Sequence, residues 1–222
     1  MKKFSFLKAK FAGDPNVGLY GFATDKYCIL GFENRQVKEK IEKTLSVPVH
    51  ITRIGNTQFA GLFAAGNSNG IIVSSLIDKE ELKILKKVTK NVVVLKTANT
   101  AIGNLILCND KGAYLSEMLK RHKQKISDVL SVEVAFGKIG AFDIPGSAAI
   151  ASNKGCLCHH EITEEQKREI EEILKVKLET GTVSHGSPFV KSGLLVNSYG
   201  VVAGESSTGY ELGVISETFG GV

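Results

Sequence analysis

The sequence predicts an α/β protein built as a closed ring of five repeated units. The first observation is a turn signature, Asn-x-x-Gly between two apolar runs, that recurs every 42 to 45 residues. The second is a glycine that opens the first apolar run of each unit at almost the same period. The third is a strand-like segment before the first unit, which supplies the element that the shortened last unit lacks. Units of this size bury their apolar faces against neighbouring units and do not fold alone.

The turn signature places a β-hairpin in each unit. It ends at Tyr27, Gly70, Gly112, Gly155 and Gly200, at intervals of 43, 42, 43 and 45 residues. Asn and Gly tolerate positive φ, which tight hairpin turns require. Units two, three and five carry the full signature, Ser152–Gly155 is a near match, and Thr24–Tyr27 is a degenerate one.

The glycine anchor marks where the first strand of each unit begins. The five glycines are Gly18, Gly61, Gly103, Gly146 and Gly193, at intervals of 43, 42, 43 and 47 residues. Two anchors with one period indicate a true repeat.

An amphipathic helix follows each hairpin, and a third strand follows the helix. Capping boxes predict three helix starts, at Asp78–Glu81, Thr163–Gln166 and Thr208–Glu211. In the helix near 163–174, Ile170, Ile173 and Leu174 form the stripe expected of a core-facing side. The third strands are expected within 47–54, 91–97, 132–139 and 176–182.

The two ends of the chain together make one unit. The 30 residues from Gly193 to the C-terminus lack a third strand, and an unassigned strand, Phe4–Phe11, lies within the 17 residues before Gly18. We expect the N-terminal strand to complete the last unit and close the ring, which removes exposed sheet edges. The prediction is one domain over 1–222, with repeats 18–60, 61–102, 103–145, 146–192, and 193–222 completed by 1–17.

Composition excludes several classes of protein. With 43% hydrophobic and 23% charged residues, the chain is neither disordered nor a coiled coil. Its apolar runs are shorter than a membrane span, and its first residues do not form a secretory signal. The four cysteines are therefore expected to be reduced thiols in the cytoplasm. The net charge of +5 permits an RNA-containing partner without establishing one.

Several segments, in their order and spacing, resemble the translation initiation factor 6 family, in particular its compact archaeal members. They are Asn16-Val17-Gly18, FAGLFAAGNSNGIIVSS, NTAIGNLILCNDKGA, SNKGCLCHHEIT, ETGTVSHGSPFV and SSTGYELGVISETF. The resemblance covers essentially the whole chain. It implies the pentein fold, a five-fold pseudosymmetric α/β propeller.

The resemblance also implies a function. The family binds the large ribosomal subunit, next to a ribosomal protein and rRNA near the sarcin–ricin loop, and sterically prevents association with the small subunit. We therefore expect a cytoplasmic, monomeric translation factor, with a part in ribosome biogenesis, that uses no cofactor, no metal and no catalysis.

Candidate ribosome-binding residues lie in or beside the loops that join the units, because loops on a rigid scaffold commonly carry function. Asn56, Asn99 and His185 lie in three of these loops. The resemblance adds the positions of Gly18 and Asn104. For Gly18, backbone geometry is the alternative explanation, since five units carry a glycine there.

Asn104 has a different argument. Its equivalents after the other anchor glycines are Leu19, Leu62, Ser147 and Leu194. An Asn where three of the four others have Leu breaks the repeat, and such breaks favour a functional role.

Other interpretations stay open. Other penteins act on guanidino groups through a Cys nucleophile, and the Cys–His neighbours here are Cys156, Cys158, His159 and His160. The same cluster is a weak metal candidate, because it lacks the usual spacing of zinc ligands. The basic helix segments 83–90 and 120–125 are either solvated helix faces or RNA contacts. The protein could also be a small-molecule- or RNA-binding module that acts off the ribosome.

Overall fold

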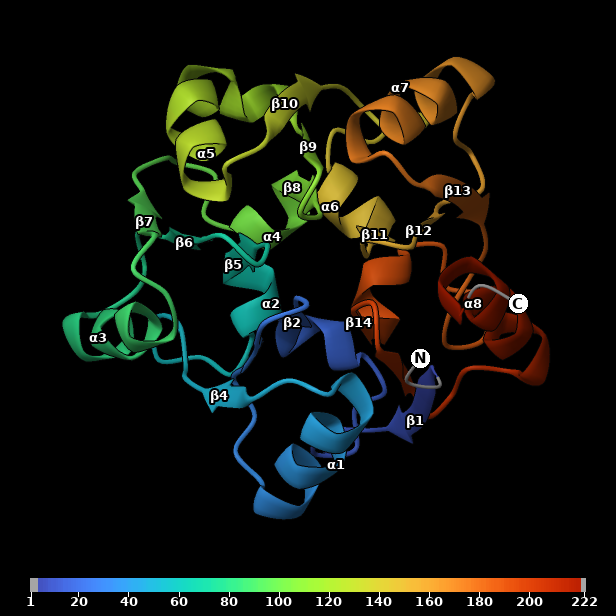
Figure 1. The fold of residues 1–222 in the computed structure, drawn as a ribbon, viewed down its shortest axis with the longest axis horizontal. Helices are drawn as coiled ribbons and strands as arrows, with labels where there is room; N and C mark the ends of the chain where they lie inside the picture. The colour runs from blue at the N-terminus through green and yellow to red at the C-terminus, as the bar shows by residue number, and fades with distance from the viewer. Residues whose placement is uncertain (1–3, 221–222) are drawn as a thin grey trace.

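The computed structural model describes residues 4–220, which form five similar units arranged around a common centre (Figure 1). Each unit contains a one-turn helix, two strands, a longer helix and a third strand. The third strand of the fifth unit comes from the N-terminal end of the chain. The mixed α/β composition and the repeat number predicted from the sequence are confirmed.

The one-turn helices are η1 (Val17–Leu19), α2 (Ala60–Phe63), α4 (Ile102–Leu105), α6 (Pro145–Ala148) and η3 (Val190–Gly193). The first strands are β2 (Gly21–Ala23), β5 (Ala64–Gly66), β8 (Ile106–Cys108), β11 (Ala149–Ala151) and β14 (Leu194–Val196). The second strands are β3 (Cys28–Leu30), β6 (Ile71–Ser74), β9 (Gly112–Leu115), β12 (Gly155–Cys158) and β15 (Gly200–Gly204).

The longer helices are α1 (Arg35–Leu45), α3 (Lys79–Val88), α5 (Lys123–Leu130), which follows the 3₁₀ helix η2 (Glu117–His122), α7 (Glu164–Leu174) and α8 (Gly209–Gly220). The third strands are β4 (Val49–Ile51), β7 (Val92–Leu95), β10 (Glu133–Phe136), β13 (Lys177–Thr180) and β1 (Ser5–Ala9). First and second strands pair antiparallel, and second and third strands pair parallel.

The N-terminal strand joins the C-terminal unit as the sequence predicts. Strand β1 pairs in parallel with β15, with Ser5 opposite Gly200 and Ala9 opposite Gly204. Phe11, just beyond β1, is fully buried in the cluster that also holds Leu195 and Val202. The two ends of the chain therefore share one sheet and one core.

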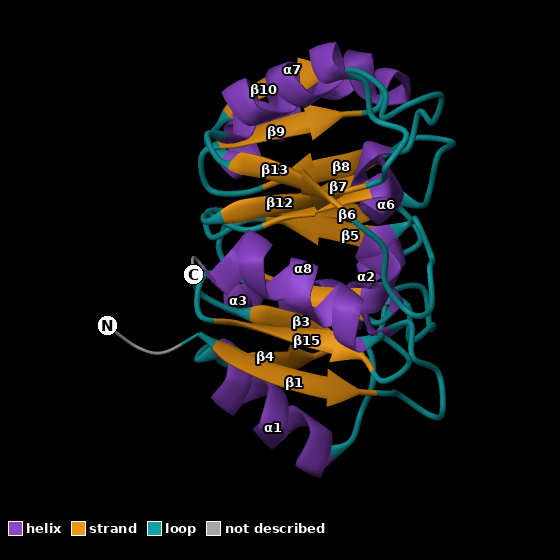
Figure 2. Ribbon diagram, turned by 90° about the vertical axis from the view of Figure 1, so that its right-hand side faces the viewer, coloured by secondary structure: helices purple, strands orange, loops and turns teal. Residues whose placement is uncertain are grey.

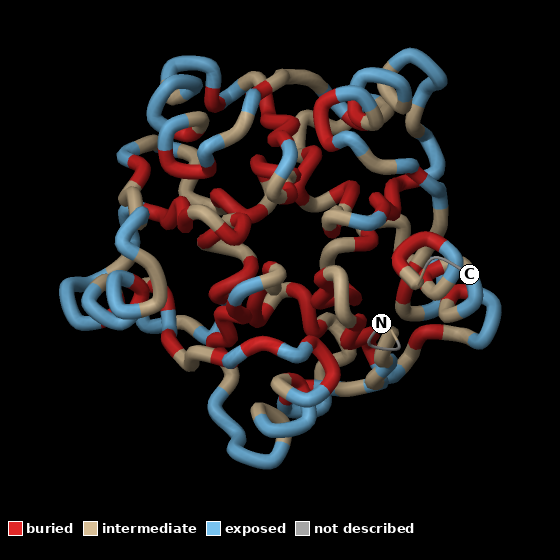
Figure 3. The backbone as a smooth tube through the Cα atoms, viewed as in Figure 1, coloured by how far each residue is buried: buried red, intermediate tan, exposed pale blue. Residues whose placement is uncertain are grey.

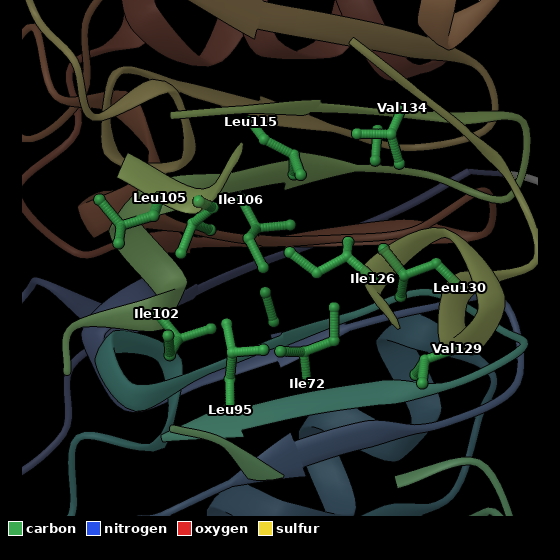
Figure 4. Close-up of a cluster of buried hydrophobic side chains, with 13 residues drawn as sticks. Ile72, Leu95, Ile102, Leu105, Ile106, Leu115, Ile126, Val129, Leu130 and Val134 are labelled. Atoms are coloured by element: carbon green, nitrogen blue, oxygen red, sulfur yellow. The ribbon is translucent and has the colours of Figure 1, made fainter. Parts of the chain in front are cut away.

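The core is divided among the boundaries between consecutive units. One cluster combines Ile72 and Leu95 of the second unit with Ile106, Leu115 and Ile126 of the third (Figure 4). Four further clusters join units one and two, three and four, four and five, and five and one. Buried residues line the inside of the assembly and exposed ones cover the outer helices (Figure 3). Each of these five clusters thus joins two neighbouring units.

The turn signature joins units as well as strands. In Asn67, the side-chain oxygen accepts from Asn69 N–H at 2.9 Å, and Nδ2 donates to the carbonyls of Asn109 and Leu130 in the next unit. Asn109 and Asn197 repeat both inter-unit bonds, Asn197 with the first unit. The turn glycine is required because a Cβ at Gly112 would lie 1.9 Å from the carbonyl oxygen of Ile173.

The structure corrects the glycine anchor of the repeat, both in where it lies and in which residue carries it in the fifth unit. The anchor glycine of units one to four lies in a helical turn, three residues before the first strand begins, rather than opening the strand. In the fifth unit the first strand begins at Leu194, so the equivalent residue is Lys191 and not Gly193. Counted to Lys191, the last interval is 45 residues, which matches the turn signature.

The glycines at these positions provide room for the backbone of the neighbouring unit. A Cβ at Gly61 would lie 2.2 Å from the carbonyl oxygen of Gly18, and one at Gly146 would lie 2.4 Å from that of Gly103. The one-turn helices consequently contact one another in succession, and η3 contacts η1.

Candidate docking site at the loop end

The molecule has two different ends (Figure 2). At the turn end lie the hairpin turns and the C-termini of the longer helices, which the turn asparagines bind. At the other end, which we call the loop end, lie the one-turn helices, the N-termini of the longer helices and the loops that join consecutive units. All five candidate residues from the sequence, Gly18, Asn56, Asn99, Asn104 and His185, lie in loops or one-turn helices of the loop end.

Asn56 is an exposed residue on a rigid loop. Gly55 and Asn56 both have a φ of 62°, and the loop closes with reciprocal backbone hydrogen bonds between Ile54 and Thr57. The Glu81 carboxylate accepts the Gly55 N–H at 2.8 Å and the Asn56 N–H at 2.9 Å. Glu81 is also the third residue of the α3 capping box, so one carboxylate fixes both the helix start and the loop.

His185 occupies the same position in the loop between the fourth and fifth units. Its φ is 66°, its side chain is exposed, and Glu211 accepts the N–H groups of His185 and Gly186 at 3.3 and 2.8 Å. Burial raises the pKa of Glu211, but hydrogen bonds from Thr208, Gly186 and Thr182 outweigh it and give a net lowering. Gln166 braces the loop at Gly140 in the same way through a neutral amide.

Asn99 lies in the loop between the second and third units, Asn104 lies in α4 of the third unit, and both are partly exposed. The side chain of Asn104 makes no hydrogen bond to any part of the chain between residues 4 and 220, so its amide is free to bind a partner. The structural alignment changes the comparison that singled it out. The equivalent residue in the fifth unit is Ser192, so the other four units have two Leu and two Ser.

Gly18 is buried, unlike the other four candidates. A Cβ there would lie 1.8 Å from the carbonyl oxygen of Lys191 and 2.7 Å from that of Leu194. The glycine therefore permits the close approach of the first and fifth units, which is the backbone explanation raised by the repeat.

Exposed apolar side chains from different units also lie at the loop end, and they were not predicted from the sequence. Phe59, Leu76, Met118 and Tyr210 are 38%, 48%, 49% and 84% exposed. Phe59 lies at the start of α2, and Leu76 lies between β6 and α3. Met118 lies at the start of η2, and Tyr210 lies at the start of α8. Exposed apolar groups at the same end of the molecule as free polar ones are a feature of protein-binding surfaces. In the sequence these residues are indistinguishable from core residues.

The cysteines do not resemble nucleophiles. Cys28, Cys156 and Cys158 are fully buried and Cys108 is partly buried. Burial raises the pKa of Cys28, Cys108 and Cys158 to about 12, so these thiols are protonated at neutral pH. A nucleophilic Cys needs an exposed position and a lowered pKa.

The fold stacks the rings of His159 and His160 on each other but does not bring the four residues of the Cys–His cluster around a common point. Cys156 and Cys158 pack in the apolar cluster with Ile170 and Leu174. His159 is buried against Phe142 and Phe189, and its Nδ1 accepts the Glu161 N–H at 3.1 Å. Within the described part of the chain, no three His, Cys, Asp or Glu side chains are grouped as a metal ion requires.

A cavity of about 50 Å³ lies at the centre of the assembly. It is lined by the first strands of all five units, which include Cys108, and by Lys191. Pockets for small-molecule ligands are commonly about 300–1,000 Å³. The central cavity is therefore much smaller than a typical pocket for a small-molecule ligand.

The basic segments lie on the outer helices. Lys83 pairs with Glu80, and Lys120 pairs with Glu117, each within one helix. None of the helices in residues 4–220 is both long and apolar enough to cross a membrane.

Comparison with known proteins identifies the family. A model of the eIF-6 family matches residues 6–218. The chain is 40% identical to translation initiation factor 6 of Staphylothermus marinus over 206 residues, and the aligned region covers 90% of this chain and 91% of that protein. It is 37% identical over 222 residues to translation initiation factor 6 of Thermococcus onnurineus, covering 96% and 97%. The corresponding protein of Haloquadratum walsbyi is 37% identical over 217 residues, covering 96% of both chains. This chain therefore belongs to the eIF-6 family.

Proposed function

We propose that this protein is a translation factor that binds the large ribosomal subunit through its loop end and sterically prevents association with the small subunit. The observation that carries the proposal is that one end of the molecule presents both free polar groups, two of them on braced loops, and exposed apolar groups. Asn56, Asn104 and His185 supply the polar groups, and Leu76 and Tyr210 are among the apolar ones. Family membership supports the assignment to translation.

Rigidity makes a steric mechanism effective. We infer that residues 1–222 form one domain whose five units close into a ring. The pairing of β1 with β15 and the contact of η3 with η1 support closure. A ring of this kind binds with little change of shape, so binding requires little ordering of loops. It then occupies surface that the other subunit needs.

The chemistry of the loop end fits a partner made of protein and RNA. Exposed Leu76 and Met118 suit apolar protein side chains, whereas Asn56 and Asn104 suit the phosphates and base edges of rRNA. We propose a ribosomal protein and the rRNA near the sarcin–ricin loop as the two contacts. The factor would act as a cytoplasmic monomer without cofactor or catalysis.

Co-sedimentation with purified ribosomal subunits tests this function. The protein is expected to travel with large subunits and not with small ones, and to inhibit formation of the joined ribosome. Asn104→Lys is expected to weaken large-subunit binding about tenfold or more while the thermal midpoint stays within 2 °C of wild type. A protein that sediments with neither subunit would contradict the proposal.

A matched pair of variants tests which end docks. Leu76→Glu places a charge on the loop end, and Ile84→Glu places the same charge on the outer face of α3 at a residue that is 38% exposed. Only Leu76→Glu is expected to weaken binding. Equal effects of the two substitutions would refute docking through the loop end.

The rival function is hydrolysis or transfer of a guanidino group. Turnover of arginine or agmatine that Cys108→Ala abolishes would favour it. The buried thiols and the small central cavity argue against this reaction.

A further inference from the structure

Lys191 breaks the pattern of the five one-turn helices. At the position three residues before the first strand, units one to four have Gly18, Gly61, Gly103 and Gly146, and the fifth unit has Lys191. A lysine at a crowded central position is unfavourable unless its ammonium group is compensated. Its contacts therefore indicate what it does.

The lysine side chain crosses the centre to two other units. Its Nζ donates to the carbonyl oxygen of Gly61 at 2.5 Å and to that of Gly103 at 3.1 Å. These residues belong to the second and third units, whereas Lys191 belongs to the fifth. A Cβ at Gly103 would lie 2.8 Å from this Nζ, so the missing side chain at Gly103 makes room for the ammonium group.

Each bound carbonyl directly precedes a residue of the loop end. Gly61 precedes Leu62 and Gly103 precedes Asn104, and both of these following side chains are partly exposed. In the one-turn helices α2 and α4, Leu62 N–H donates to Phe59 and Asn104 N–H donates to Ala101, each at 3.0 Å. A helix of one turn is not stable alone, so an outside donor strongly affects its orientation.

We propose that Lys191 is a positioning residue that holds the turns of α2 and α4 through its ammonium group and thereby sets the orientation of Leu62 and Asn104 for docking. Charge-assisted hydrogen bonds are shorter and stronger than neutral ones, which suits this role. The proposal rests on the docking function proposed above. By this proposal the fifth unit contributes to binding through Lys191, although Lys191 lies far from Asn104 in the sequence.

The first test removes the ammonium group and keeps most of the length of the unbranched side chain. Lys191→Met is compared with Lys154→Met, which alters an exposed lysine at the turn end. Hydrogen exchange of the backbone amides, measured without ribosomes, is expected to speed up at least tenfold at Leu62 and Asn104 in Lys191→Met only. Exchange in β9 and β12 is expected to stay within twofold. Uniformly faster exchange, or no change at Leu62 and Asn104, would overturn the proposal.

The second test asks whether Lys191 acts through Asn104 and Leu62. Lys191→Met is expected to weaken large-subunit binding about tenfold in the wild-type background. In a chain that already carries Leu62→Ala and Asn104→Ala, it is expected to weaken binding less than threefold, because the groups it positions are absent. Equal losses in both backgrounds would show that Lys191 does not act through these residues.

The two tests separate the two proposals. If wild-type protein fails to bind large subunits, the docking function is wrong, and the exchange experiment still decides whether Lys191 holds α2 and α4. If wild-type protein binds and Lys191→Met binds equally well, the docking function stands and the positioning role is wrong.

Discussion

Replacing Gly18 by alanine is expected to destabilise the protein through steric conflict with the backbone of the fifth unit. The φ of Gly18 is not positive, so alanine can adopt its backbone conformation. The added Cβ would nevertheless lie 1.8 Å from the carbonyl oxygen of Lys191 and 2.7 Å from that of Leu194. Both obstacles are backbone atoms of the fifth unit, which cannot rotate away as a flexible side chain does.

The size of the effect follows from the overlap. Overpacking a well-packed core costs roughly 1–3 kcal/mol. Because the first and fifth units must separate by more than an ångström here, we expect the upper end, about 3 kcal/mol. In a domain of this length, 1 kcal/mol lowers the thermal midpoint by about 2–4 °C. Gly18→Ala is therefore expected to melt roughly 6–12 °C below wild type.

Gly213→Ala provides the matched control. Gly213 is exposed within α8, and a Cβ there would have no atom within 4 Å. Alanine at such a helix position is expected to stabilise by about 0.4–1 kcal/mol and raise the midpoint by about 1–4 °C. Thermal unfolding followed by circular dichroism measures both variants. If the Gly18→Ala midpoint lies within 2 °C of wild type, the close approach of the first and fifth units does not explain this glycine. Gly18 would then again be a candidate for direct contact with the ribosome.

Three further predictions concern the loop brace, the thiols and the N-terminal strand. Because the folded-state pKa of Glu211 is lowered, its ionised form stabilises the fold above the unfolded pKa of about 4.3, and this stabilisation is lost as pH falls through the folded pKa. Glu211→Gln is thus expected to lower stability in urea unfolding at pH 7 and to match wild type at pH 2–3, whereas a pH-independent difference would exclude the linkage. Native protein at pH 8 is expected to leave all four cysteines unalkylated by iodoacetamide and to react at all four after unfolding; rapid native labelling of Cys108 would revive the enzymatic reading. Removal of residues 1–11 takes away β1 and buried Phe11 and is expected to lower the midpoint by 10 °C or more and to expose 193–220 to proteolysis, so an equally stable truncated protein would rule out ring closure.

Much of the fold is predictable from local sequence. The turn signature, the capping boxes at Asp78 and Thr163, and the stripe of Ile170, Ile173 and Leu174 all describe interactions within a few residues. The structure confirms them because local chemistry and packing agree here. The added role of the turn asparagines, which bind the next unit, depends on residues 42 to 173 positions away.

The candidate site is less predictable. Sequence reasoning placed Asn56 and His185 in loops, but their bracing by Glu81 and Glu211 joins residues about 25 positions apart. Leu76 and Met118 were not identified because apolar residues in a sequence give no sign of exposure. Gly18 was correctly suspected of a backbone role from the repeat.

The sequence by itself determined the number of units, the order of the hairpin, the longer helix and the third strand within each, and the use of the N-terminal strand to complete the last one, because a periodic pattern carries this information regardless of the distances in space. The one-turn helix at the start of each unit appears only in the structure. Only the tertiary structure decided which residues are equivalent at the centre. In the fifth unit, the residue equivalent to the anchor glycines of the other units is Lys191 and not Gly193. The equivalence depends on which residue faces the backbones of the neighbouring units, and not on residue type. The link from Lys191 to Gly61 and Gly103 spans 130 and 88 residues, and only the packed centre brings these groups together.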